Sequence, residues 1–389
     1  MKKNFKFETE AIRTQTERTQ FLEHSTPLYL TSSFIFEDAE DMRASFAEEK
    51  DRNIYSRYSN PNSSEFIDKV CKMEGAEDGF AFASGMAAVF STFAALLESG
   101  DHIISARSIF GSTHSLFTQY FPKWNVSTSY FKIDELDKLV GLLTPNTKII
   151  YAESPTNPGV DVLDLEELGK FAKKHNLIYI IDNCFASPYL QQPIKFGADL
   201  VIHSGTKLMD GQGRVLAGIT VGSKALIDKV YRFSRITGPA LSPFNAWVLS
   251  KSLETLALRV DKHCDNALKL AEFLEEHPKI NWVKYPFLKS HPNYEIAKRQ
   301  MKAGGCVVAF EVKGGVEAGQ KFFNAIKMLS LSANLGDSRS IVTHPASTTH
   351  SKLSLQDRLA SGITDGMVRV SVGLEHIDDI IEDISQALE

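Results

Sequence analysis

LIYIIDNCFASPYLQQPIKFGADLVIHSGTK, residues 177–207, contains two short apolar runs that each end in side chains suited to chemistry. The first run, Leu177–Ile181, is followed by Asp182, and the second, Asp199–His203, is followed by a turn that contains Lys207. Runs of this length that are rich in Ile and Val are typical of buried strands. The stretch therefore predicts two buried strands with a carboxylate after one and an amine after the other.

Runs of the same kind precede this stretch in the chain, at Gly79–Ala83, Asp101–Ser105 and Lys148–Ala152. Helical patterns, such as Leu165–His175, separate them. Because parallel strands need crossover connections, this alternation predicts an α/β fold with a mostly parallel central sheet and helices on both faces. Ligands in such sheets bind at the carboxyl ends of the strands.

The uncharged stretch Phe80–Leu97 is the one segment with the composition of a membrane span. Ser84-Gly85 interrupts it near its start, which favours a buried strand, a turn and a buried helix over Met86–Leu97. We therefore expect no contact with a membrane.

The remainder of the chain divides around a long helical pattern, predicted as one helix from Ala246 to Glu276 that bridges two domains. After it come strand-like runs at Cys306–Val312 and Met367–Val372 and helical runs at Val316–Ile326 and Ile377–Leu388. We expect an N-terminal arm that contacts a neighbouring subunit, a cofactor-binding α/β domain and a smaller C-terminal α+β domain, over residues 1–60, 61–250 and 251–389.

Composition excludes several classes of protein. The 389 residues include 43 Lys and Arg and 48 Asp and Glu, a net charge of −5, so no excess positive charge is available for nucleic acid. Four cysteines without a C-x-x-C pair fit neither a disulfide scaffold nor a zinc ribbon. The N-terminus has no apolar segment of the secretory kind. We expect reduced thiols and a cytoplasmic location.

Asp182 and Lys207 suggest a particular chemistry when they are taken together. Alone, Asp182 fits an ordinary turn and Lys207 an ordinary surface cation. A lysine desolvated at the end of a buried strand can instead form an imine, and pyridoxal 5'-phosphate also needs a carboxylate for its pyridinium and donors for its phosphate. Ser84, Gly85 and Met86, at the start of the predicted helix, together with Ser204 and Thr206, supply such donors.

With these residues the chain resembles the Cys/Met-metabolism branch of fold-type I pyridoxal-phosphate enzymes. The similarity covers nearly the whole chain. The motifs that carry it are, in order, Tyr55-Ser56-Arg57, Asn60-Pro61, Ser84-Gly85-Met86-Ala87, Glu153-Ser154-Pro155-Thr156-Asn157-Pro158, Asp182-Asn183-Cys184-Phe185, Ser204-Gly205-Thr206-Lys207, His344-Pro345-Ala346-Ser347 and Arg369-Val370-Ser371-Val372-Gly373.

The resemblance implies roles for individual residues. Lys207 would hold the cofactor and move protons, Asp182 would pair with the pyridinium, and Phe110 would stack on the ring. Asn157 would contact the phenolic oxygen. The substrate carboxylate would bind Arg369, with Asn334 close by.

Two further residues, Tyr55 and Arg57, would reach the phosphate from a neighbouring subunit. The resemblance thus implies a homo-oligomer with shared active sites, for which a tetramer is expected. It implies a small amino acid as substrate and no metal.

Departures from the common family pattern indicate the branch. Many relatives have Tyr where this chain has Phe110, which can stack but cannot exchange a proton. The Asp210-Gly211-Gln212-Gly213-Arg214 stretch and Cys184 resemble the sulfhydrylases that act on O-succinylhomoserine, and Cys184 fits a packing role better than a nucleophilic one. We predict γ-replacement by sulfide on O-succinyl- or O-acetylhomoserine, which yields homocysteine for methionine biosynthesis.

Two alternatives stay open from the sequence. A sibling enzyme would make cystathionine, or would catalyse γ-elimination as methionine and cystathionine γ-lyases do. A catalytically silent binding module with the same fold would be a different class of protein, against which the joint presence of Lys207, Asp182, Arg57 and Arg369 argues.

Overall fold

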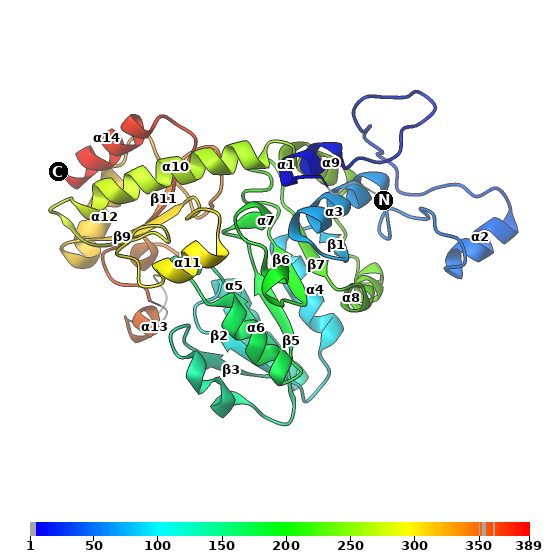
Figure 1. Ribbon diagram of the computed structural model, residues 1–389, viewed down its shortest axis with the longest axis horizontal. Helices are drawn as coiled ribbons and strands as arrows, with labels where there is room; N and C mark the ends of the chain where they lie inside the picture. The colour runs from blue at the N-terminus through cyan, green and yellow to red at the C-terminus, as the bar shows by residue number, and fades with distance from the viewer. Residues whose placement is uncertain (1–4, 350, 352–354, 361) are drawn as a thin grey trace.

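The computed structural model describes residues 5–349, 351, 355–360 and 362–389, and its chain builds two sheets (Figure 1). The larger sheet has seven strands in the order β1-β7-β6-β5-β4-β2-β3, and only β7 runs antiparallel to its neighbours. Its strands are β1 (Asp78–Phe82), β2 (His102–Ala106), β3 (Ser127–Phe131), β4 (Thr147–Glu153), β5 (Ile178–Asp182), β6 (Leu200–His203) and β7 (Gly218–Gly222).

Every residue of β2, β6 and β7 is buried, which requires cover on both faces of the sheet. The predicted α/β class and the five predicted strands are confirmed. Strands β3 and β7 were not predicted, because β3 is a polar, half-exposed edge strand and β7 begins and ends in glycine.

The helices associated with this sheet are α3 (Pro61–Glu74), α4 (Gly85–Leu96), α5 (Gly111–Ser115), α6 (Leu165–Lys174), α7 (Ser187–Leu190), α8 (Lys224–Thr237) and α9 (Pro243–Leu253). Helix α4 begins where the Ser84 side chain accepts a hydrogen bond from the amide of Ala87, 3.1 Å away. The uncharged stretch Phe80–Leu97 is therefore a strand, a turn and a buried helix, as predicted. Among the described residues, no helix combines the length and the apolar character needed to cross a membrane.

The long helix predicted over 246–276 is wrong in one respect: it is two helices, α9 and α10 (Leu256–Glu275). The carbonyl oxygen of Ser252 accepts hydrogen bonds from the amide of Thr255 and, at 2.9 Å, from the Arg259 guanidinium. The regular partner of that carbonyl would be the amide of Leu256, so the ladder breaks there. The apolar spacing continues across the break, which is why periodicity did not reveal it.

The second sheet has five strands in the order β10-β11-β12-β9-β8. Its elements are β8 (Ile280–Lys284), α11 (Tyr294–Gln300), β9 (Val307–Val312), α12 (Gly315–Ala325), β10 (Ser330–Leu331), β11 (Ile341–Thr343), α13 (Leu355–Ala360), β12 (Met367–Ser371) and α14 (Ile377–Leu388). Helices α10, α12 and α14 pack together beside it and enclose a separate core that includes Phe310, Phe322 and Ile384. The predicted strands and helices of this region are present.

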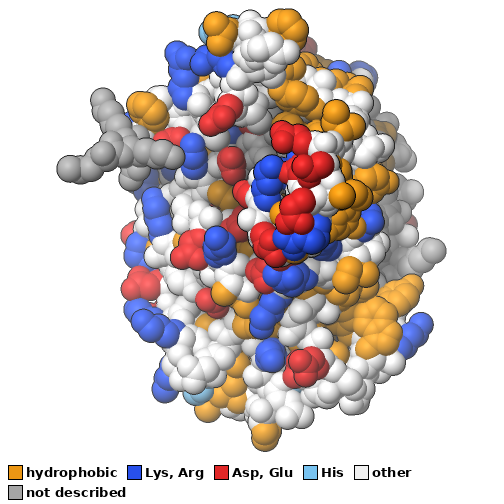
Figure 2. Space-filling model, turned by 90° about the vertical axis from the view of Figure 1, so that its right-hand side faces the viewer, with side chains coloured by type: hydrophobic (Ala, Val, Ile, Leu, Met, Phe, Trp, Pro, Cys, Tyr) orange, Lys and Arg blue, Asp and Glu red, His pale blue; other side chains and the backbone are white. Residues whose placement is uncertain are grey.

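Residues 5–60, the part of the predicted arm that the structure describes, contain two short helices, α1 (Phe7–Arg13) and α2 (Ala39–Phe46). Figure 1 shows α2 and a long loop of this segment standing out from the rest of the molecule. Several of its large apolar residues are exposed to solvent: Phe21 is 82%, Leu22 77% and Ile35 90% exposed. Figure 2 views this side and shows charged side chains gathered next to hydrophobic ones.

One buried carboxylate fastens the base of this segment to the body. Glu65 of α3 is 2% exposed and accepts hydrogen bonds from the amide of Thr16 at 3.1 Å and the hydroxyl of Thr26. The ammonium of Lys69, which is fully buried, lies 3.4 Å from it.

Replacing Glu65 by Ala is expected to destabilise the protein by about 3 kcal/mol, because Lys69 would keep its charge in the interior with a weaker set of partners. Thermal unfolding followed by circular dichroism measures the change. The matched control is Lys269→Ala, which removes the exposed pair with Asp265 and should change the stability by less than about 1 kcal/mol. Equal effects of the two substitutions would contradict the assignment.

Candidate active site

A cavity of about 610 Å³ opens at the carboxyl ends of the parallel strands. Most residues proposed from the sequence line it, although they come from distant parts of the chain. These are Ser84, Gly85, Met86, Phe110, Asn157, Asp182, Ser204, Thr206, Lys207 and Arg369. The fold thus brings together at one edge what the sequence separates by up to hundreds of positions.

Lys207 lies in the turn after β6, half-buried, with its ammonium directed at the loop between β10 and β11. Its Nζ donates a hydrogen bond to Oδ1 of Asn334, 2.5 Å away. Burial lowers the pKa of Lys207, and the nearby positive charge of Arg369 lowers it further. A larger share of the amine is therefore neutral and able to attack a carbonyl carbon.

Asp182 ends β5 at the floor of the cavity and is 6% exposed. Its Oδ1 accepts a hydrogen bond from the amide of Cys184 at 3.0 Å, so the turn role considered from the sequence is also present. Its Oδ2 lies 3.4 Å from the hydroxyl of Tyr151. Burial raises the pKa of Asp182, and a cation placed above it would favour the charged form.

The start of α4 forms another part of the cavity wall. The amides of Gly85 and Met86 belong to the first helical turn, which has no acceptors within the helix. Gly85 packs tightly against the turn after β6, so that a Cβ at position 85 would lie 2.9 Å from the Cβ of Ser204. A helix start with a close backbone approach suits a phosphate group.

Arg369 projects from β12 of the second sheet into the same cavity and is 5% exposed. Its Nη1 donates to Oδ1 of Asn157 at 2.8 Å, and its Nη2 donates to the carbonyl oxygen of Asn334 at 3.1 Å. Its Nε is buried without a hydrogen-bond partner among the described residues. An unpaired, buried guanidinium N–H is suited to a carboxylate on a bound molecule.

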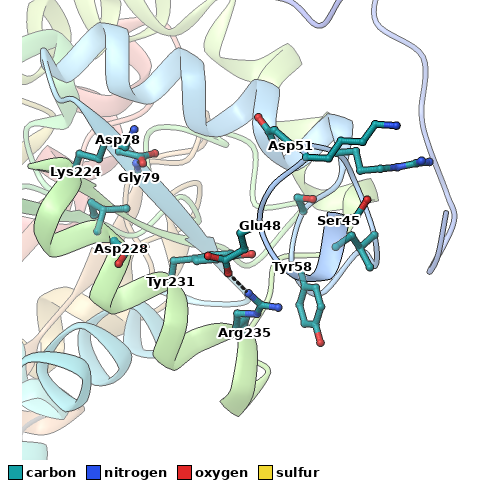
Figure 3. Close-up of a pocket in the computed structure, with 15 residues that line it drawn as sticks. Ser45, Glu48, Asp51, Tyr58, Asp78, Gly79, Lys224, Asp228, Tyr231 and Arg235 are labelled. Carbon is teal, nitrogen blue, oxygen red and sulfur yellow. Dashed lines mark hydrogen bonds and ion pairs between the residues drawn. The ribbon is translucent and has the colours of Figure 1, made fainter. Parts of the chain in front are cut away.

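Tyr55 and Arg57 do not reach this cavity within the chain. The Arg57 guanidinium donates to the carbonyl oxygen of Arg235 on α8 and lies 5.6 Å from the ring of Tyr55. Figure 3 shows the adjoining hollow of about 420 Å³, where Tyr58 and Arg235 lie next to each other. No residue of that hollow also lines the cavity around Lys207.

Several residues that line the cavity were not assigned a role from the sequence. Glu153 stood within a quoted motif, and its position at the end of a predicted strand was the available signal. Thr343 lies in β11 of the second sheet, Leu335 comes from the loop before β11, and Pro345, which stood within a quoted motif, follows it. Burial raises the pKa of the Cys184 thiol, which agrees with a packing role rather than a nucleophilic one.

These features of one cavity fit one cofactor in chemical type: an amine, a buried carboxylate, and a helix start for an anion. Together with the mostly parallel sheet, they define the class as a fold-type I enzyme that depends on pyridoxal 5'-phosphate. The chain belongs to the Cys/Met metabolism PLP-dependent enzymes, a family whose model matches residues 8–389.

Several characterised relatives are similar over nearly their whole length. The O-succinylhomoserine sulfhydrylase of Pseudomonas aeruginosa is 44% identical, with 98% of this chain and 95% of the relative covered. The L-methionine gamma-lyase of Fusobacterium nucleatum subsp. polymorphum is 41% identical, with 100% and 99% covered.

Two solved structures share the fold. MetB from Corynebacterium glutamicum superposes with a TM-score of 0.92 at 35% identity, covering 99% of this chain and 98% of its own. A protein of Campylobacter jejuni described as an O-acetylhomoserine (thiol)-lyase gives a TM-score of 0.94 at 36% identity, covering 99% and 100%. The latter structure contains a pyridoxyl-lysine monophosphate residue.

Substituting Arg369 by Lys should lower kcat/KM by about 100-fold, because an ammonium cannot make the paired hydrogen bonds of a guanidinium. The change should appear mainly in KM for the amino-acid substrate. Steady-state kinetics measures it, and Arg299→Lys on α11 provides a control at an arginine outside the cavity. A KM that stays the same in Arg369→Lys would contradict the role of Arg369 in carboxylate binding.

Proposed function

We propose that the protein catalyses γ-replacement on an O-acylhomoserine, O-succinyl- or O-acetylhomoserine, with sulfide, to give homocysteine and a free carboxylate. The observation that carries this is Phe110 at the cavity wall, where an aromatic ring without a hydroxyl can stack but cannot deliver a proton. Succinate and acetate leave without an acid. The sulfhydrylase relatives at 44% identity support the same reaction.

The chain's own residues would act in a definite order. Pyridoxal 5'-phosphate, when bound, supplies an electron sink for the electron pair left by deprotonation. Arg369 and Asn157 would hold the substrate carboxylate, and Asp182 would keep the proton on the cofactor's ring nitrogen. Lys207 Nζ would take the proton from Cα and pass it to the bound cofactor, so that the amine is neutral again and able to take one from Cβ.

Loss of the acyloxy group from Cγ and addition of hydrosulfide at the same carbon complete the exchange, after which Lys207 would return the protons to Cβ and Cα. The balance is one O-acylhomoserine and one hydrosulfide consumed, and one homocysteine and one carboxylate formed. The amides of Gly85 and Met86, with Ser204 and Thr206, would anchor the phosphate and so keep the cofactor in the cavity, where Phe110 would stack on its ring.

We further propose a homo-oligomer, most simply a tetramer in the cytoplasm, in which Tyr55 and Arg57 complete a neighbouring subunit's site. Their separation from the cavity of their own chain and the exposed apolar side chains of residues 21–35 support this. The division into an arm over 1–60 and domains over 61–250 and 251–389 belongs to the same proposal.

The second candidate is γ-elimination, supported by the L-methionine gamma-lyase relatives at 40 to 42% identity. A cystathionine synthase, with cysteine in place of sulfide, is a variant of the first. All three reactions would use Lys207 and Asp182. They differ in whether sulfide, cysteine or no nucleophile adds at Cγ.

The test is product identification by mass spectrometry. The purified, cofactor-loaded protein receives each ester separately, with sulfide and cysteine in competition, and methionine in a parallel reaction. Homocysteine from either ester confirms the proposal and identifies the acyl group. Cystathionine would indicate the synthase, and 2-oxobutyrate without thiol incorporation, or methanethiol from methionine, would indicate the lyase.

A further inference from the structure

The carboxyl of Glu153 connects three parts of the cavity and has no role in the mechanism above. Glu153 is the last residue of β4, directly opposite Asp182, the last residue of β5. Residues opposite each other on neighbouring strands project to the same face, so two carboxyls share one edge of the sheet. Their exposed fractions are 4% for Glu153 and 6% for Asp182.

The hydrogen bonds of Glu153 reach segments that are far apart in the sequence. Its Oε2 accepts from the amide of Phe110, 2.7 Å away, although Phe110 lies 43 positions earlier in the chain. It also accepts from the backbone amide of Asn157. Asn157 in turn accepts from Arg369 through its side chain. The carboxyl of Glu153 is therefore bonded to the backbone of Phe110 and to the backbone of Asn157, and the Asn157 side chain in turn bonds Arg369.

Phe110 has two backbone hydrogen bonds: its amide donates to Glu153, and its carbonyl oxygen accepts the amide of His114 at 3.0 Å, so the bond to Glu153 is the one that ties Phe110 to the central sheet. It precedes the five-residue helix α5 and makes no side-chain cap to it. Its ring is 43% exposed, so packing within the chain holds it only partly. A residue meant to stack on a flat ring must keep its backbone still for the ring to stay parallel.

We propose that Glu153 is a positioning residue that fixes the backbone of Phe110 and of Asn157, and thereby sets the ring of Phe110 against the cofactor and Arg369 against the substrate. The inference rests on the proposed function only for the placement of the cofactor on Lys207.

The protonation state of Glu153 makes the proposal testable by a conservative variant. Burial and the adjacent Asp182 raise the pKa of Glu153, opposed by the two backbone amides and by the field of Arg369. Of the two carboxyls, Asp182 also has Tyr151 as a donor and the lowering field of His203. Asp182 therefore has the surroundings that better favour the charged form, and the bond from the Phe110 amide needs only an acceptor oxygen on residue 153. A glutamine has the same shape and offers the same acceptor.

The experiment compares Glu153→Gln with Glu153→Ala, and uses Glu167→Ala on the exposed face of α6 as the control. Five quantities are measured: the circular dichroism induced in the cofactor's visible absorption band, the cofactor dissociation constant, kcat, KM, and the melting temperature of the apoprotein. The visible signal reports the asymmetry of the cofactor's surroundings and needs no turnover.

The expected result is that Glu153→Gln keeps the visible signal and stays within about 3-fold of the parent kcat, while Glu153→Ala loses at least half of the signal and about 30-fold in kcat. If Glu153→Gln loses as much as Glu153→Ala, the charge rather than the bond matters, and the proposal is overturned. It is also overturned if Glu153→Ala lowers only the melting temperature while signal and kcat persist. Borohydride reduction followed by peptide mapping shows in each variant whether the cofactor is on Lys207, so a failure of the proposed site is seen separately.

Discussion

Lys207→Ala is expected to abolish turnover, with a loss of at least about 10⁴-fold in kcat, because one amine both attaches the cofactor and moves every proton of the proposed reaction. Burial lowers the pKa of this amine, and no other lysine lines the cavity within the described part of the chain. The variant should fold, because Nζ has one hydrogen bond in the structure, to Asn334.

The measurement is the rate of thiol formation together with borohydride reduction and peptide mapping. The parent protein should yield a peptide labelled at Lys207, and the variant none. Lys229→Ala, at an exposed position of α8, is the matched control and should stay within about 2-fold of the parent. Turnover above about 1% in Lys207→Ala, or a label on another lysine, would refute the assignment.

Asp182→Asn has the second largest expected effect, a loss of about 10³-fold in kcat with the cofactor still attached to Lys207. The amide has the shape of the carboxyl and can still accept from the amide of Cys184. It cannot stabilise a proton on the ring nitrogen, so the ring becomes a much weaker electron sink. The loss should therefore fall on kcat, with KM nearly unchanged.

Absorbance of the bound cofactor and steady-state kinetics check this prediction. Asp199→Asn provides the control. Asp199 lies just before β6, at the amino end of that strand and away from the cavity, and its side chain accepts a hydrogen bond from the amide of Tyr179 at 2.8 Å. It should keep activity within about 3-fold. The role of Asp182 would be wrong if both variants behaved alike, or if Asp182→Asn merely failed to bind the cofactor.

The central sheet could be predicted because its signal is local. Buried parallel strands are short continuous apolar runs, and Leu177–Ile181 and Asp199–His203 show this pattern without any knowledge of their neighbours. Strand β3 shows the limit of that signal: at the edge of the sheet it is only partly buried and begins with Ser, Thr and Ser, and a polar run does not look like a strand. The break between α9 and α10 was missed for a related reason, since Arg259 interrupts the backbone ladder and leaves the apolar spacing intact.

The residues of the candidate site also differ in whether the sequence alone could locate them. Lys207, Asp182 and Gly85 each follow a predicted strand, so the rule that ligands bind at carboxyl ends located them. Arg369 and Asn334 come from another sheet, and only the resemblance to a family suggested that they belong to the same site. Glu153 is a third case. Its place at the end of a predicted strand could be read from the sequence, but its hydrogen-bond partner could not, because Phe110 lies 43 positions away.

The sequence by itself thus determined the fold class, the order of its strands along the chain, and the pairing of an amine with a carboxylate, since hydrophobic periodicity and turn chemistry act between neighbours in the chain. Only the tertiary structure decided which segments meet: the antiparallel insertion of β7 between β1 and β6, the reach of Arg369 into the cavity, and the distance of Tyr55 and Arg57 from it. Those contacts join residues tens to hundreds of positions apart, and their geometry depends on how whole elements pack.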